Sequence, residues 1–182
     1  MRLKKQKPTS LESYAKQFPS LTEAGFANCF IIPRVCTSNN FLKEFQFKLL
    51  HRYLPTNRLL FKMGKVESDK CAFCRLYTET IVHVMCECLC VRDIWLCVQT
   101  TLSRLQGFDI KLSSADIILG YQLNNSPLSN KLINNVILHV KLFLWKRKSL
   151  SLNPTLSELK EFINNNRTFE QDLERFYEEM SP

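Results

Sequence analysis

The sequence is poor in the motifs from which the common classes of enzyme active site are built. Its 182 residues include only four glycines, and these form neither a Gly-rich phosphate-binding loop nor a Gly-x-Ser-x-Gly nucleophile elbow. No Asp-Asp pair of the polymerase type is present, and the chain is too short for a polymerase palm with its separated metal-binding carboxylates. We therefore expect no catalytic residues and no enzyme activity.

Long apolar runs are also missing. No stretch reaches the roughly 18 apolar residues that cross a bilayer, and the basic start MRLKKQKPTS lacks the apolar segment of a secretion signal. The eight cysteines are therefore expected in a reducing compartment, where thiol clusters indicate metal sites and not disulfides. The sequence predicts an intracellular protein of the cytoplasm or nucleus, with no membrane partner and no small-molecule substrate.

Positive charge is unevenly distributed along the chain. The net charge is +8 and the pI is near 9.1. From residue 155 to residue 182, seven acidic residues outnumber three basic ones, so residues 1–154 carry +12. This balance favours a polyanionic partner, and we expect RNA or DNA.

Apolar residues recur at helical spacing through most of the chain, which predicts an all-α fold. Residues 1–20 are expected to form a flexible basic arm. Residues 21–182 are expected to form a single multi-helix domain in which a short zinc knuckle joins two helical parts. Capping residues, proline and glycine indicate where helices begin and end. Helices are expected near 41–53, 56–63, 81–105, 114–119, 128–149 and 155–163, the first two forming a hairpin, with a short acidic helix in the last residues.

The cysteine-rich segment KCAFCRLYTETIVHVMCEC contains the strongest chemical pattern. Cys71 and Cys74 are two residues apart, and His83 and Cys88 follow with four residues between them. Structural zinc takes four tetrahedral ligands from thiolates and imidazoles, usually as two close pairs joined by a loop. The pattern predicts a structural zinc site over residues 71–88. A metal-free cluster of buried thiols is the alternative, because free cysteine is often buried.

The identity of the fourth ligand is open on this reasoning. If one regular helix began near Glu79, the residue five positions after His83 would be rotated about 140° from it. Helical geometry alone then favours Cys86 or Cys90 over Cys88. A bend after His83, or a helix that begins only after His83, would again allow Cys88 to be the fourth ligand.

The ordered set of segments resembles a known region. FQFKLLHRYLPTNRLLFKMG (residues 45–64), DKCAFC, ETIVH, Cys88 and Trp95 resemble the zinc-binding region at the C-terminal end of LINE-type (non-LTR retrotransposon) reverse transcriptases. The resemblance covers roughly residues 20 to 170, and the basic stretch NKLINNVILHVKLFLWKRKSL resembles the helix that closes such polypeptides. It implies the ligand set Cys71, Cys74, His83 and Cys88.

The family implies a function as well. In it, this region is thought to help hold template RNA or target DNA, so the chain would correspond to the downstream end without the catalytic part. The catalytic part of a reverse transcriptase is then a further expected partner. Two basic stretches are candidates for phosphate contacts, the first with aromatic residues between its cations. They contain Lys48, Arg52, Arg58, Lys62 and Lys65, and Lys141, Lys146, Arg147 and Lys148.

Two other functions fit the same sequence. The chain can be a protein-interaction or scaffold domain, in which the basic faces are incidental and the apolar helices and acidic tail bind a partner. It can also be a retroelement relic with no selected activity. Scattered cations on the folded surface would favour the scaffold over nucleic-acid binding.

Overall fold

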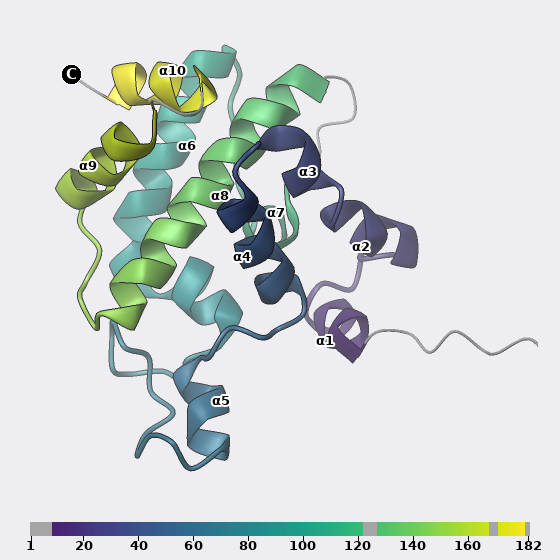
Figure 1. Cartoon of the computed structure of the whole chain (residues 1–182), viewed down its shortest axis with the longest axis vertical. Helices are drawn as coiled ribbons and strands as arrows, with labels where there is room; N and C mark the ends of the chain where they lie inside the picture. The colour runs from purple at the N-terminus through teal and green to yellow at the C-terminus, as the bar shows by residue number, and fades with distance from the viewer. Residues whose placement is uncertain (1–8, 122–126, 168–170, 181–182) are drawn as a thin grey trace, which may run out of the picture.

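The computed structural model describes residues 9–121, 127–167 and 171–180, in which helices are joined by loops (Figure 1). The predicted all-α class is confirmed: within the described ranges the only β-type pairing is an isolated bridge between Lys70 and Thr78. No helix in those ranges has the length and hydropathy to cross a bilayer. The elements are α1 (Thr9–Gln17), α2 (Glu23–Cys29), α3 (Ile32–Cys36), α4 (Asn40–Leu50), α5 (Asn57–Lys62), the π-helical turn η1 (His83–Glu87), the 3₁₀ turn η2 (Leu89–Val91), α6 (Arg92–Gln106), α7 (Ser114–Leu119), α8 (Pro127–Ser149), α9 (Leu156–Arg167) and α10 (Gln171–Met180).

Helix α8 is the centre of the fold. Every residue from 132 to 144 is buried, including Asn134, Asn135, His139 and Lys141, and a helix that is buried around its whole circumference belongs in a core. α8 packs against α3, α4, α9, α10 and η1, and Figure 1 shows it crossing the middle of the molecule. α8 is thus a deeply buried helix, and it contacts the cysteine-rich segment through η1.

Lys141 lies inside this core. It is only 1% exposed, and its ammonium donates hydrogen bonds to Gln46 Oε1 at 2.6 Å and to the Ile118 carbonyl at 3.5 Å. Burial lowers the pKa of Lys141 from 10.5 to about 7, because a low-dielectric core disfavours the cation. The predicted phosphate contact by Lys141 is therefore wrong, since the ammonium cannot reach a phosphate at the surface.

The burial of Lys141 predicts a pH dependence of stability. Between about pH 7 and about pH 10 the unfolded chain keeps a proton on Lys141 that the folded chain has lost, so the free energy of unfolding rises with pH. The rise is at most about 1.4 kcal/mol per pH unit. Lys141→Met should remove this rise, which urea denaturation across that window would measure. A wild-type profile that parallels the profile of the variant would contradict the assignment.

The N-terminal residues are more ordered than expected. Helix α1 is packed onto α4: Tyr14 is fully buried and donates a hydrogen bond to the Leu49 carbonyl at 2.8 Å. Tyr14 also lies under the Arg52 guanidinium, 5.2 Å from its ring centroid. The predicted flexible arm is wrong for residues 9–17, because Tyr14 and Leu11 supply an apolar face. The remainder of the basic start, residues 1–8, lies outside the described residues.

Helix α4 ends in a left-handed turn at Arg52. The Tyr53 N–H donates to the Lys48 carbonyl at 2.8 Å and the Arg52 N–H to the Leu49 carbonyl at 2.9 Å, which is a Schellman motif. Glycine usually occupies the left-handed position, but here Arg52 has φ 59°. This conformation costs a residue with a Cβ about 1–2 kcal/mol. The chain therefore keeps a strained arginine where glycine would fit more easily.

Helix α5 does not form the predicted hairpin with α4. Of the two N-cap candidates at its start, Thr56 and Asn57, the structure selects Thr56, whose Oγ1 accepts from the Leu59 N–H at 3.3 Å. However, α5 has no buried residue and does not pack along α4. Figure 1 shows it in a lobe at the opposite end of the molecule from α10. Pro55 therefore separates the two helices without folding them together.

Candidate metal centre

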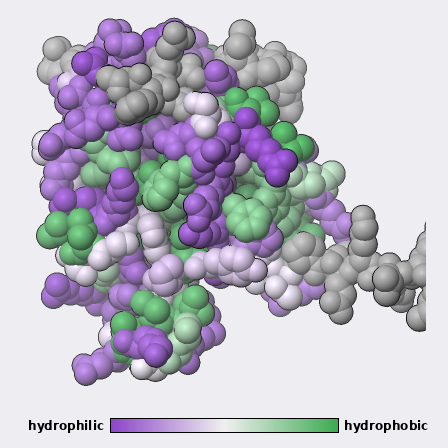
Figure 2. Space-filling model, in the orientation of Figure 1, coloured by the Kyte–Doolittle hydropathy of each residue, from purple (hydrophilic) through white to green (hydrophobic). Residues whose placement is uncertain are grey.

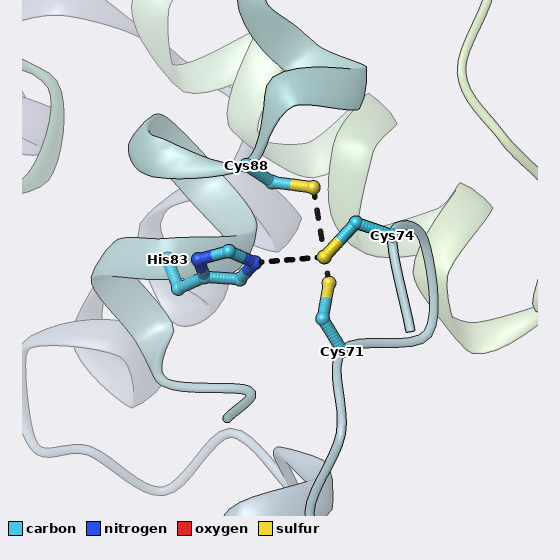
Figure 3. A group of neighbouring side chains, drawn as sticks. All are labelled: Cys71, Cys74, His83 and Cys88. Atoms are coloured by element: carbon cyan, nitrogen blue, oxygen red, sulfur yellow. Dashed lines mark hydrogen bonds between the residues drawn. The ribbon is translucent and has the colours of Figure 1, made fainter. Parts of the chain in front are cut away.

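Four side chains from two segments converge at the base of the η1 turn. Figure 3 shows Cys71 and Cys74 on one loop facing His83 and Cys88 on the other segment. Their ligand atoms all lie within 4.8 Å of one another. The Cys71 and Cys88 sulfurs are 3.9 Å apart, and Cys74 Sγ is 3.4 Å from His83 Nε2. These four residues are the ones that the spacing and the resemblance singled out.

The π-helical turn explains how Cys88 reaches His83. The Cys88 N–H donates to the His83 carbonyl at 2.8 Å, a bond that spans five residues. A π turn adds one residue to the helical turn, so the fifth residue returns toward the side of the first. Helical geometry favoured Cys86 or Cys90, but the structure leaves both outside the group. The regular-helix assumption is wrong because the chain changes its hydrogen-bonding pattern at His83.

The Cys71–Cys74 turn presents backbone donors to its first sulfur. The Arg75 N–H closes the turn on the Cys71 carbonyl at 2.9 Å. The hydrogen bond between the Cys71 and Cys88 sulfurs lowers the pKa of Cys71 and raises the pKa of Cys88. The N–H groups of Cys74 and Phe73 also lower the pKa of Cys71, against its burial. Because the thiolate is the form that binds metals, metal binding at this pair requires Cys88 to lose its proton.

The distances fit a tetrahedral metal ion. Zinc bonds of about 2.3 Å to sulfur and about 2.0–2.1 Å to nitrogen place tetrahedral ligands about 3.8 Å apart for two sulfurs and about 3.6 Å for sulfur and nitrogen. The observed 3.9 Å and 3.4 Å lie close to these values. Cys71, His83 and Cys88 are buried and Cys74 is half-buried. Three thiols and one imidazole thus form a group that can hold a metal ion with no position left for a substrate.

A buried carboxylate, Glu79, connects the loop of the cysteines to the rest of the fold. Its oxygens accept hydrogen bonds from the Asn57 and Ala72 N–H groups, both at 2.7 Å. The Lys148 ammonium at the end of α8 lies 3.1 Å from the same carboxylate and also donates to the Pro55 carbonyl at 2.8 Å. Glu79 is fully buried and Lys148 is 8% exposed. The predicted phosphate contact by Lys148 is therefore wrong.

The sequence analysis predicted no structural role for Glu79. An acidic residue in a polar loop is typical of solvent exposure, and its partners are backbone N–H groups that have no sequence signature. The resemblance contained the only signal, because Glu79 is the acidic residue of the Glu-Thr-x-x-His segment. In that segment Thr80 Oγ1 accepts from the His83 N–H at 2.9 Å, so both polar residues position the ligand-bearing turns.

Trp95 on α6 lies in the core. It is buried, and its Nε1–H donates to the Met85 carbonyl at 2.6 Å. A carbonyl within the π turn thereby gains a donor from outside the turn. Trp95 therefore braces the segment between His83 and Cys88 and is not exposed for base stacking.

The first basic stretch contributes three residues to one pocket. Arg52, Arg58 and Lys62 line a pocket of about 290 Å³ between α1 and α5, with Ser13 and Thr80 among the other lining residues. None of these three cations is in an ion pair with any residue that the structure describes. Among the residues that the structure describes, no acidic one lines this pocket, so positive charge is concentrated there.

The other predicted cations are less available. Lys48 pairs with Glu44 on α4 at 2.6 Å, and Lys65 is exposed beyond α5. Arg147 is largely buried, pairs with Glu158 at 2.8 Å and donates to the Asn153 carbonyl at 3.0 Å. Lys146 is exposed, with its ammonium 5.1 Å from the Phe162 ring centroid. Of the predicted patch at the end of α8, only Lys146 is exposed. Arg147 is paired with Glu158 of α9, and Lys148 is paired with Glu79.

Comparison with known protein families, with curated proteins and with solved structures finds no match to this chain.

Proposed function

We propose that the chain is a zinc-stabilised nucleic-acid-binding module, similar to the C-terminal zinc-binding region of LINE-type reverse transcriptases and lacking a polymerase active site. The observation that carries the proposal is the convergence of Cys71, Cys74, His83 and Cys88 within 4.8 Å. That ligand set in that order is the one the family resemblance implies. The catalytic part of such an enzyme remains a proposed partner.

Zinc is the metal that best suits these donors. Thiolate-rich tetrahedral groups with one imidazole select zinc over magnesium and calcium, which prefer oxygen ligands. When bound, the ion would supply cross-linking of two short segments and no chemistry on a substrate. The residues of the chain position the ligands: Glu79 holds the Cys71–Cys74 turn, and Thr80 and Trp95 hold the π turn between His83 and Cys88.

The pocket of Arg52, Arg58 and Lys62 supports binding to a phosphate backbone. Unpaired cations gathered in one concave site attract phosphates and release counterions on binding. Both RNA and DNA carry this backbone, so either can be bound. The scaffold alternative expected scattered cations, whereas three of the predicted ones share one pocket.

The double variant Arg58→Glu/Lys62→Glu tests this proposal. We expect nucleic-acid affinity to fall at least tenfold and the slope of log K against log salt to become shallower by about 0.7–0.9 for each phosphate that is no longer neutralised. Filter binding or fluorescence anisotropy over a salt series measures both quantities. The matched control is Lys111→Glu/Arg175→Glu, which makes the same charge change at exposed sites outside the pocket. Equal losses of affinity in both variants would point to net charge alone.

One observation favours the protein-interaction alternative. α5 and the residue after it expose Leu59, Phe61 and Met63, and Figure 2 shows hydrophobic side chains on the lobe that α5 occupies. A solvent-exposed apolar lobe is typical of a contact surface for another protein. If the chain binds no nucleic acid at low salt, this surface becomes the leading functional candidate.

A further inference from the structure

Four rings form a cluster next to the phosphate pocket. The His51 and Tyr53 rings are stacked with centroids 5.4 Å apart and an angle of 21°, and Phe47 lies 4.2 Å from His51. Phe30 lies 5.3 Å from His51. Phe47 is 48% and Tyr53 66% exposed. This ring cluster therefore offers aromatic surface to solvent, of the kind on which unpaired bases stack.

The ring cluster and the phosphate pocket are joined at Arg52. Arg52 lines the pocket, while His51 and Tyr53, its two chain neighbours, belong to the ring cluster. Successive Cα atoms are about 3.8 Å apart, so the pocket and the ring cluster meet at one three-residue segment of the chain. The left-handed turn produces this arrangement: the two flanking rings stack on each other, while the guanidinium extends over the Tyr14 ring of α1.

A second hollow adjoins the ring cluster. Phe30, Phe47 and His51 line a groove of about 540 Å³ whose lining also includes Arg34, Lys43 and Glu44, the last of which is paired with Lys48. Aromatic rings with cations beside them provide base-stacking and backbone contacts for a further nucleotide. Phe47 and His51 belong to both the ring cluster and this groove, and Arg52 of the pocket follows His51 in the chain, so the three features can act as one track.

We infer that the nucleic acid bound by this track is a single strand, with a backbone phosphate at Arg52, Arg58 and Lys62 and a neighbouring base on the exposed Tyr53 or Phe47 ring. The inference deepens the proposed function and rests on it. A duplex offers phosphates, but its bases are paired and stacked on each other, so it presents no free base face to Tyr53. Selectivity for a single strand follows from the rings and not from the charges.

The experiment compares fluorescein-labelled oligouridylate and oligothymidylate of about 12 nucleotides with a duplex of the same length, by anisotropy on the zinc-loaded full chain. We expect the single strands to bind more tightly than the duplex. Tyr53→Leu should weaken single-strand binding by about 5-fold or more, given the contribution of base stacking, and leave duplex binding unchanged. Tyr53→Phe keeps the ring and should bind as the wild type does. Phe108→Leu, an exposed aromatic after α6, is the matched control.

Zinc content and thermal unfolding of each variant establish that it is folded before affinities are compared. Arg52→Gly adds a variant that separates folding from binding: it removes the left-handed strain, so the fold should survive while single-strand affinity falls. If Tyr53→Leu and Phe47→Leu bind single strands as tightly as the wild type while Arg58→Glu/Lys62→Glu does not, the inference is overturned and the proposed function stands. If the duplex binds more tightly than the single strands, the inference is also overturned. Failure of every probe to bind would overturn both.

Discussion

Cys71→Ser is expected to release the metal and unfold the segment from residue 71 to residue 88. Structural zinc contributes about 10–16 kcal/mol to folding in small zinc domains, which is as large as the total stability of most domains. The loss of zinc should also loosen α5 and α6, because Glu79 and Trp95 act on turns that the metal would hold. Elemental analysis of protein purified under reducing conditions gives the zinc content, and far-UV circular dichroism with urea unfolding measures the decrease in helical structure and stability.

Three other cysteine variants make the test specific. Cys88→Ser should lose the metal as Cys71→Ser does, because its sulfur is one of the four converging atoms. Cys86→Ser and Cys97→Ser should keep one zinc per chain, since neither thiol belongs to the group. A wild-type protein that binds no zinc, or a Cys86→Ser variant that loses it, would contradict the four-ligand site. If the wild-type protein binds no zinc, the thiols of Cys71, Cys74 and Cys88 would be core residues only.

Local signals in the sequence predicted the helices well. One of the two candidate N-caps at each of three helix starts is the observed cap: Asn39 for α4, Thr56 for α5 and Ser113 for α7. These starts were predictable because a cap depends on residues within one turn of itself. The buried central helix α8 also followed from apolar spacing. Such features need no knowledge of the remainder of the fold.

Features that depend on distant partners were not predicted. Lys141 was placed in a surface patch because its neighbours in sequence are basic, and only the packing of α4 against α8 places it beside Gln46. The position of Cys88 beside His83 depends on a π turn, which a regular helical period does not contain. The ligand types and spacing were therefore readable from the sequence, but the backbone geometry that brings them together was not.

Glu79→Gln is expected to lower the free energy of unfolding by about 3–5 kcal/mol, because it leaves the buried Lys148 ammonium without its counter-ion. The glutamine also offers a single acceptor oxygen to the Asn57 and Ala72 N–H groups, which now each have a carboxylate oxygen. Ala72 lies between the two ligands of the first turn, so zinc affinity should fall roughly 10- to 100-fold, as it does when outer-shell partners of metal ligands are removed. Urea denaturation and competition with a zinc-binding dye measure the two effects.

An exposed ion pair on α4 provides the control for the Glu79→Gln prediction. Lys48 and Glu44 are 2.6 Å apart, closer than Lys148 and Glu79 at 3.1 Å, but their side chains are 51% and 58% exposed. Glu44→Gln should therefore cost less than about 1 kcal/mol, because water screens exposed charges. The double variant Glu79→Gln/Lys148→Met removes the orphaned cation and should recover part of the stability. If Glu79→Gln cost no more than Glu44→Gln, the carboxylate would not be the link between the metal loop and α8, and the lobe containing α5 would have to be held by the metal alone.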